Sequence, residues 1–174
     1  MKNIVKIILI LAAITVSNNI LKADIPYFVD FKYILNESNA GKGAQKYLKD
    51  KLENGIKNIK KKEKLIQDEE KKIIQQKKII SAEEYKKKVT ELRNKVSSLK
   101  SERNSLLESV SKQRTKARNE LLKNLNPIIQ AYMKKNSIRM VIDKKAILLA
   151  DENLDLTKNI IAQLNAKLKT IKLN

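Results

Sequence analysis

Residues 80–85 read Ile-Ser-Ala-Glu-Glu-Tyr, and this stretch decides how the long central segment of the chain folds. Ser81 with Glu84 three positions later is a capping box, a pattern that begins a helix. Because helical sequence lies on both sides of it, a restart at Ser81 predicts a tight turn between two helices that fold back on each other. The alternative is one continuous helix running through Ser81.

Apolar residues seven positions apart on both sides of this turn favour the hairpin, since each row can be buried only against the other. The eight residues of these two rows, which we call the seam, are Leu52, Ile59, Ile66, Ile73, Tyr85, Leu92, Leu99 and Leu106. The companion positions of the first row are partly polar, at Glu63, Glu70 and Lys77. We therefore expect an antiparallel coiled-coil hairpin about 55 Å long, with a thin seam and some flexibility.

The flanking segments predict a small β base at the two ends of the chain. β-branched and aromatic residues in Ile25–Leu35 favour a strand at least as far as Asp30. Pro127 is expected to kink or end the second helix. The predicted fold is mainly α, with the hairpin inserted between short strands. Its parts are a first body segment (24–43), the hairpin (44–136, tip near 80–82), and a second body segment (137–174) with strands at 137–143 and 146–150 and a final helix capped by Asp155 or Thr157.

The first residues resemble an export signal. Residues 7–16 carry no charge and follow Lys2, but roughly 20 apolar residues are needed to cross a bilayer. A short apolar run after a positive start is typical of a secretory signal peptide. We expect cleavage after Ala23, with Ser17 as the alternative, and a mature protein outside the cytoplasm.

The chain is strongly basic, with 38 Lys and Arg against 19 Asp and Glu and a net charge of +19. Such a charge attracts anions, and the candidates are nucleic acid, anionic lipid headgroups and acidic polypeptides. Most of the basic residues are Lys, which favours diffuse attraction over the planar recognition that Arg provides. A basic group beside the expected tip is a candidate surface for a client or a membrane: Lys77, Lys78, Lys86, Lys87 and Lys88.

No catalytic constellation is present in the sequence. The chain has no His and no Cys, so the commonest bases, thiol nucleophiles and zinc ligands are missing. Gly41-Lys42-Gly43 lacks the spacing and the Ser or Thr of a phosphate-binding loop. We expect no enzyme activity, no cofactor, no metal and no small-molecule substrate.

The order of these segments resembles the Skp/OmpH family of periplasmic chaperones over essentially the whole mature chain. The residues that carry the resemblance are Val29-Asp30, residues 34–38, Gly41 to Ala44, residues 80–88, Ile138 to Asp143 and Ala146 to Leu149. The resemblance implies a homotrimer in the periplasm, in which short strands of three subunits form a barrel-like body and three hairpins hang from it. It also implies that unfolded outer-membrane proteins are held between the hairpins without ATP. Trimer contacts would fall on Val29, Met140, Ile142, Ile147 and Leu148.

Two other functions compete with a chaperone. A structural coiled coil of the cell envelope would explain the heptads but not the strands at both ends, and it would be expected to have a more continuous seam. A nucleic-acid-binding protein would explain the charge, but the chain has few aromatic residues to stack on bases and few Arg to read them. Export also argues against nucleic acid as the partner.

Overall fold

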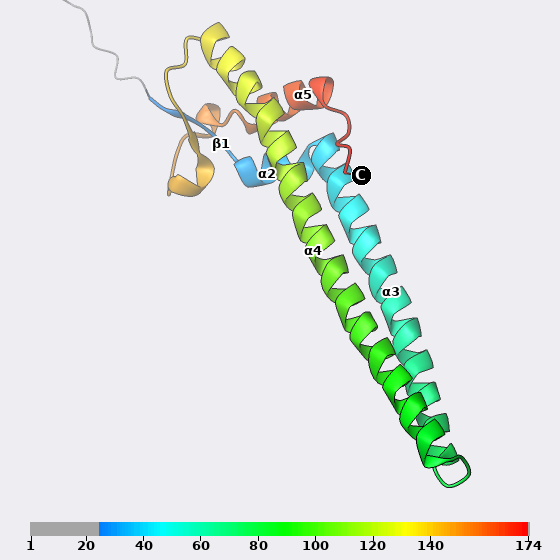
Figure 1. The fold of residues 1–174 in the computed structure, drawn as a ribbon. Helices are drawn as coiled ribbons and strands as arrows, with labels where there is room; N and C mark the ends of the chain where they lie inside the picture. The colour runs from blue at the N-terminus through cyan, green and yellow to red at the C-terminus, as the bar shows by residue number, and fades with distance from the viewer. Residues whose placement is uncertain (1–24, 174) are drawn as a thin grey trace, which may run out of the picture.

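The protein is a long helical hairpin that projects from a small body containing both ends of the described chain (Figure 1). The computed structural model describes residues 25–173, so the predicted signal peptide lies outside the described residues. The elements are β1 (Tyr27–Val29), α2 (Phe31–Glu37), α3 (Asn39–Gln76), α4 (Ala82–Lys135), β2 (Val141–Asp143), the 3-10 helices η1 (Lys144–Ala146) and η2 (Glu152–Leu154), and α5 (Thr157–Lys167). We call α3 and α4 together the arm.

The predicted reversal at the tip is confirmed. α3 ends at Gln76, and the backbone N–H groups of Ile79 and Ile80 donate to the Gln76 carbonyl at 2.9 and 3.1 Å. The Ser81 hydroxyl then accepts a hydrogen bond from the Glu84 N–H at 3.1 Å, which begins α4. Because this cap satisfies one of the free amide groups of a helix start, the chain can leave one helix and enter the next within a few residues.

The arm begins earlier than the predicted residue 44. Ser38 caps α3 in the same way, with its hydroxyl accepting from the Gly41 N–H at 3.2 Å, so the helix starts at Asn39. At 1.5 Å per residue, α3 is about 57 Å long and α4 about 80 Å. The surplus length of α4 carries its last turns past the start of α3 and into the body (Figure 1).

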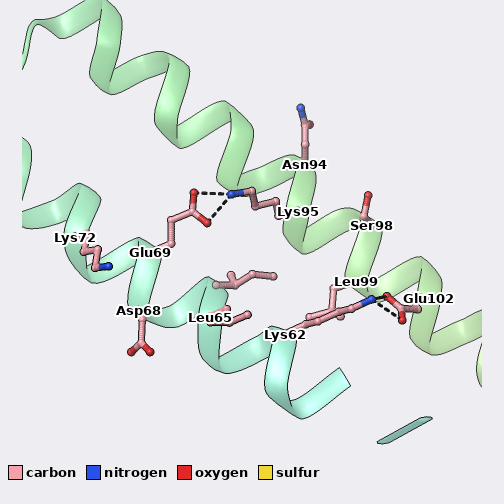
Figure 2. Close-up of a pocket in the computed structure, with 11 residues that line it drawn as sticks. Lys62, Leu65, Asp68, Glu69, Lys72, Asn94, Lys95, Ser98, Leu99 and Glu102 are labelled. Atoms are coloured by element: carbon pink, nitrogen blue, oxygen red, sulfur yellow. Dashed lines mark hydrogen bonds and ion pairs between the residues drawn. The ribbon is translucent and has the colours of Figure 1, made fainter. Parts of the chain in front are cut away.

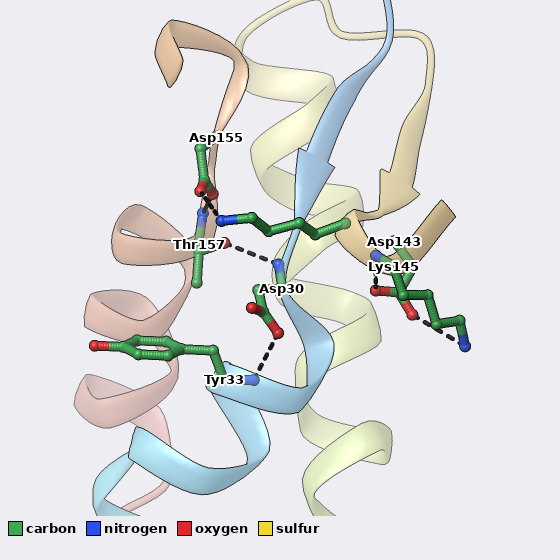
Figure 3. Close-up of polar contacts among 7 residues, drawn as sticks. Asp30, Tyr33, Asp143, Lys145, Asp155 and Thr157 are labelled. Carbon is green, nitrogen blue, oxygen red and sulfur yellow. Dashed lines mark hydrogen bonds and ion pairs between the residues drawn. The ribbon is translucent and has the colours of Figure 1, made fainter. Parts of the chain in front are cut away.

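The first body segment contains a helix that the sequence analysis missed. The predicted strand from Ile25 ends at Val29, and α2 follows at Phe31. Figure 3 shows the reason: the Asp30 carboxylate accepts from the Tyr33 N–H at 2.7 Å, and the Asp30 N–H donates to the Thr157 hydroxyl at 2.9 Å. Aspartate at a helix start outweighs the strand preference of the aromatic residues after it.

The β base is smaller than predicted. β1 and β2 pair in parallel, with Tyr27 opposite Val141 and Val29 opposite Asp143. On its other side β1 bridges to residue 155, where the Leu156 N–H donates to the Phe28 carbonyl at 2.9 Å. β1 is therefore the central strand of the base, and β2 pairs with no other strand of residues 25–173.

The predicted strand at 146–150 is wrong within the single chain. The Asp143 carboxylate accepts from the Lys145 N–H at 3.2 Å and turns the backbone into η1. The residues that follow run through a bend without a strand partner. Of the predicted strand at 137–143, only Val141–Asp143 pairs. Hydrophobic side chains alone do not make a strand where no neighbouring strand satisfies the backbone.

Pro127 does not end the second helix, as the sequence analysis had allowed, because α4 continues from Ala82 to Lys135. Pro127 lies on the exposed side of the helix, whereas Ile128 and Ile129 are buried. A Pro ring clashes with the preceding turn and removes a hydrogen bond, so the packing of its two neighbours must stabilise the helix at this point.

The body core gathers residues from every part of the chain. Its fully buried side chains include Val29 of β1, Ile34 of α2, Leu125 and Ile128 of α4, and Ile160 of α5. In α5, Ile160 and Leu164 lie on the predicted apolar face. The N-cap is Leu156 and not the predicted Asp155 or Thr157, because the Asp155 carboxylate accepts from the Thr157 N–H at 2.8 Å just before the helix. The core therefore holds both roots of the arm.

A second apolar cluster joins the arm to the end of the described chain. Leu173 is buried against Ala44 and Leu48 of α3 and against Val110 and Ala117 of α4. The Gln113 side-chain amide donates to the Leu173 carbonyl at 2.6 Å. The segment after α5 therefore crosses the root of the arm and packs against both of its helices.

Gly41 and Gly43 give a matched test of the packing at the arm root. A Cβ on Gly41 would lie 2.0 Å from the Leu35 carbonyl oxygen, whereas a Cβ on Gly43 would meet nothing within 4 Å. We expect Gly41→Ala to lower the free energy of unfolding by about 1–3 kcal/mol through overpacking. Gly43→Ala should raise it by about 0.5–1 kcal/mol, because Ala is the better helix former. Denaturant unfolding measures both, and equal effects would contradict the close approach of α2 to α3.

Candidate functional site

The seam residues face each other along the arm, but their burial is uneven. Ile59 and Ile73 of α3 are buried, whereas the other six predicted seam residues are half-buried: Leu52, Ile66, Tyr85, Leu92, Leu99 and Leu106. Leu106 lies against Gly55, where a Cβ would come within 2.4 Å of its methyl carbon. The two helices thus approach closely at Gly55, and the six half-buried seam residues leave part of their apolar surface open to solvent at several levels of the arm.

Ion pairs between the helices supplement the thin middle of the seam. The Lys62 ammonium donates to both Glu102 oxygens, at 2.8 and 2.6 Å. The Lys95 ammonium donates to both Glu69 oxygens at 2.7 Å. Glu69, within the acidic run at 68–70, thus reaches across to α4. In the sequence each helix has a Lys seven residues before a Glu, and the antiparallel arrangement places each Lys opposite the Glu of the other helix.

A polar network continues the contact at the root. The Lys51 ammonium of α3 donates to the Ser109 hydroxyl and to the Gln113 side-chain oxygen of α4, at 2.8 and 2.9 Å. Gln113 in turn donates to the Leu173 carbonyl. One glutamine thus joins both helices of the arm to the segment after α5.

The five predicted basic residues lie together at the tip. Lys77 and Lys78 belong to the turn, and Lys86, Lys87 and Lys88 belong to the first turns of α4. The Lys77 ammonium lies 5.8 Å from the centre of the Tyr85 ring, and Lys88 pairs with Glu84 at 3.8 Å. Ile79, which the sequence analysis did not select, is 83% exposed between these lysines. The tip therefore combines positive charge with an exposed apolar side chain.

Surface ion pairs keep the outer faces of the arm charged. A hydrogen bond to Glu37, supported by the attraction of its charge, raises the pKa of Lys42, and Asp50 raises the pKa of Lys46 in the same way. A hydrogen bond from Lys112 and its positive charge lower the pKa of Glu108. Each shift moves the group further from neutral pH, so these side chains remain ionised under physiological conditions.

The five residues expected at trimer contacts differ in accessibility. Val29 has no exposed surface and belongs to the core of the single chain, which corrects its expected role at a contact. Met140 is exposed, and Ile142 and Ile147 are half-buried. Leu148 is 100% exposed, and its neighbour Leu149, which was not selected, is 94% exposed. Exposed apolar side chains thus stand shortly before and after β2 in the chain, at Met140, Leu148 and Leu149.

Neither a metal centre nor a membrane span is found in the part of the chain that the structure covers. Residues 25–173 contain no group of acidic, His or Cys side chains placed to hold a metal ion. Over the same residues, no helix combines the length and the apolar character needed to cross a bilayer.

The sequence that folds into this arm and body matches a known family. The family model described as "Outer membrane protein (OmpH-like)" matches residues 27–164, which is most of the chain. The chain belongs to the OmpH-like family. No curated protein matches it.

A solved structure shares the fold of this OmpH-like protein. It is a candidate outer membrane chaperone (OmpH-like) from Caulobacter crescentus CB15, with a TM-score of 0.79 and 20% sequence identity. The similarity covers 85% of this chain and 89% of the other. It shows that the arm and the body are arranged alike in two sequences that share few residues.

A charge-reversal cycle tests whether the ion pairs between the helices stabilise the arm of this OmpH-like protein. Glu69→Lys should destabilise α3 and α4 by about 0.5–1 kcal/mol, because it places two like charges together. Adding Lys95→Glu restores an opposite pair and should recover most of the loss. Thermal unfolding followed by circular dichroism measures both, and 1 M salt should shrink the effect. A double variant as unstable as the sum of its two single variants would contradict the pairing.

Proposed function

We propose that this OmpH-like protein is a periplasmic chaperone that holds unfolded outer-membrane proteins between its arms and prevents their aggregation without ATP. The single observation that carries the proposal is the arm itself. It is long, basic and incompletely buried along its own seam, so apolar side chains such as Leu65 and Ile74 are available between the charges. Family membership and the resemblance of the first residues to an export signal support the same role.

A holdase that uses no ATP must release its client by itself, so each contact has to be weak. An arm with scattered apolar groups makes several weak contacts, and several arms acting together raise the affinity without any strong site. Between Glu37 and Lys135 the chain has 27 basic and 13 acidic residues. This charge attracts acidic segments of a client from a distance, and the attraction weakens as the salt concentration rises.

We also propose that the working unit is a homotrimer assembled through the body. Leu148 and Leu149 are almost fully exposed in the single chain, and β2 offers an edge with unpaired backbone groups. An open strand edge beside apolar side chains favours pairing with another chain.

The basic tip supports a further contact with an anionic membrane surface. Each Lys close to such a surface contributes about 1 kcal/mol of attraction. Ile79 lies among these lysines and gives an apolar group that can enter the headgroup region.

Light scattering of the mature protein, with and without an unfolded outer-membrane protein, tests the proposed function. We expect a trimer that forms a soluble complex of defined mass with the client. A monomer that leaves the client to aggregate would contradict the proposal. A fixed filament that has no effect on the client would instead favour a structural coiled coil, and salt-sensitive binding of DNA without an effect on the client would favour a nucleic-acid-binding protein.

Substitution of the exposed leucines tests the assembly. Leu148→Ser together with Leu149→Ser should convert the trimer to monomers at micromolar concentration, because the subunit contact loses two apolar side chains. Leu107→Ser is the matched control, since Leu107 is half exposed but lies on the arm. Sedimentation velocity distinguishes the states. If the Leu148/Leu149 double variant and the Leu107 control form equally stable trimers, the subunit contact must lie elsewhere.

A further inference from the structure

The arm contains a groove between its two helices, nearer the tip than the root of α3. Figure 2 shows this groove with the residues that line it. Its volume is about 810 Å³, and its apolar lining is formed by Leu65, Ile66 and Leu99. Ile66 and Leu99 are half-buried seam residues, whereas Leu65 is 69% exposed. The groove therefore presents a leucine that no other part of the described chain covers.

Two ion pairs bound this groove along the arm. Figure 2 shows Lys95 joined to Glu69 on one side of Leu65 and Lys62 joined to Glu102 on the other. On α3, Lys62 and Glu69 are seven residues apart, and so are Lys95 and Glu102 on α4. Seven residues correspond to about 10 Å along a helix axis. Because each pair connects α3 to α4, the groove has two polar ends and an apolar centre of limited length.

The charge around the groove differs from that of the rest of the arm. Its lining contains three basic residues (Lys62, Lys72 and Lys95) and three acidic residues (Asp68, Glu69 and Glu102). The arm as a whole has about twice as many basic as acidic residues. A polyanion is therefore attracted to the tip and the outer faces of the arm rather than to this groove. A rim of both signs instead suits a polypeptide, whose backbone has donors and acceptors in equal supply.

We propose that this groove seats a large apolar side chain of an extended client segment in which apolar and polar residues alternate. The proposal rests on the chaperone function proposed above and names the site on the arm that serves it. An extended chain rises about 3.3 Å per residue and points successive side chains to opposite sides. A groove of about 10 Å accepts one large side chain, or two small ones two residues apart, while the polar residues between them face solvent and the charged rim.

The strands of outer-membrane barrels have this alternating pattern. One side chain in two faces lipid and is apolar, and the next faces the interior and is polar. An unfolded segment of such a strand therefore matches the spacing of the groove, with Leu65 and Leu99 contacting the apolar side chain. A lipid acyl chain would fill the apolar centre but, unlike a polypeptide backbone, would form no hydrogen bond with the charged side chains at its two ends.

Leu65→Ser and Leu107→Ser form a matched pair for the test. Both leucines are at least half exposed on the arm, but only Leu65 lines the groove. With the trimeric protein and an unfolded β-barrel client, we expect Leu65→Ser to raise the Kd roughly 10-fold and Leu107→Ser to raise it less than about 2-fold. Equal unfolding midpoints for the two variants check that both fold.

Cross-linking identifies the occupant. The chain has no Cys, so Asn94→Cys places a unique photo-reactive label in the groove, and Ser111→Cys places one on α4 outside it. The probes are two synthetic peptides of equal composition, one alternating apolar and polar residues and one with the same residues in blocks. We expect the alternating peptide to form adducts at residue 94 in several-fold excess over the block peptide and over residue 111.

The outcomes separate the two proposals. If the unmodified protein holds the client but the two leucine variants bind it equally, the groove proposal fails and the chaperone proposal stands. If the unmodified protein leaves the client to aggregate, the chaperone proposal fails first. If both peptides form adducts at residue 94 equally well, the groove does not prefer a segment in which apolar and polar residues alternate. Adducts formed with vesicles of anionic lipid, or with a second copy of this chain, would overturn the polypeptide as the occupant.

Discussion

The pairing of β1 with β2 is the contact on which the rest of the structure depends, because it joins the chain before the arm to the chain after it. Tyr27 lies opposite Val141, so the whole arm is inserted between two strands of three residues each. Strands this short do not hold together by themselves. They are stabilised by the core beneath them, where Val29 and Ile34 from one side of the arm meet Leu125 and Ile160 from the other. A small core thus anchors a much longer arm (Figure 1).

The interactions that hold the arm together change from its root to its tip. At the root, Ala44, Leu48 and Val110 are buried together with Leu173. In the middle, half-buried seam residues and ion pairs such as Lys62–Glu102 replace that apolar packing. Exposed ion pairs contribute less than buried hydrophobic contacts, typically about 0.2–1 kcal/mol each. The free energy of local opening should therefore fall along the arm, and the part best suited to adapt to a client is the part that is held least tightly.

Repeated local signals made the arm predictable from the sequence, whereas the body depended on contacts that no local pattern records. The heptads and the Ser81 cap each specify their own helix, and both survive in the structure. α2 was missed because the aromatic residues from Phe31 to Tyr33 favour a strand by composition, whereas the Asp30 cap in front of them begins a helix. Residues 146–150 have the composition of a strand but no partner in the single chain. The Lys95–Glu69 pair depends on the register in which α3 and α4 face each other. The Leu173 contact depends on where the segment after α5 crosses the arm. Neither is visible in a local sequence pattern.

A small core anchors an arm whose stability declines with distance from it, and hydrogen–deuterium exchange along the assembled protein measures this decline. We expect the strongest protection around Leu125 and Ile160, intermediate protection at Ala44–Leu48, and the weakest protection in the helical residues of 67–76 and 82–98. A client should then slow exchange mainly in that weakly protected part. Uniform protection along α3 and α4, or faster exchange in the body than at the tip, would show that the core does not anchor the arm.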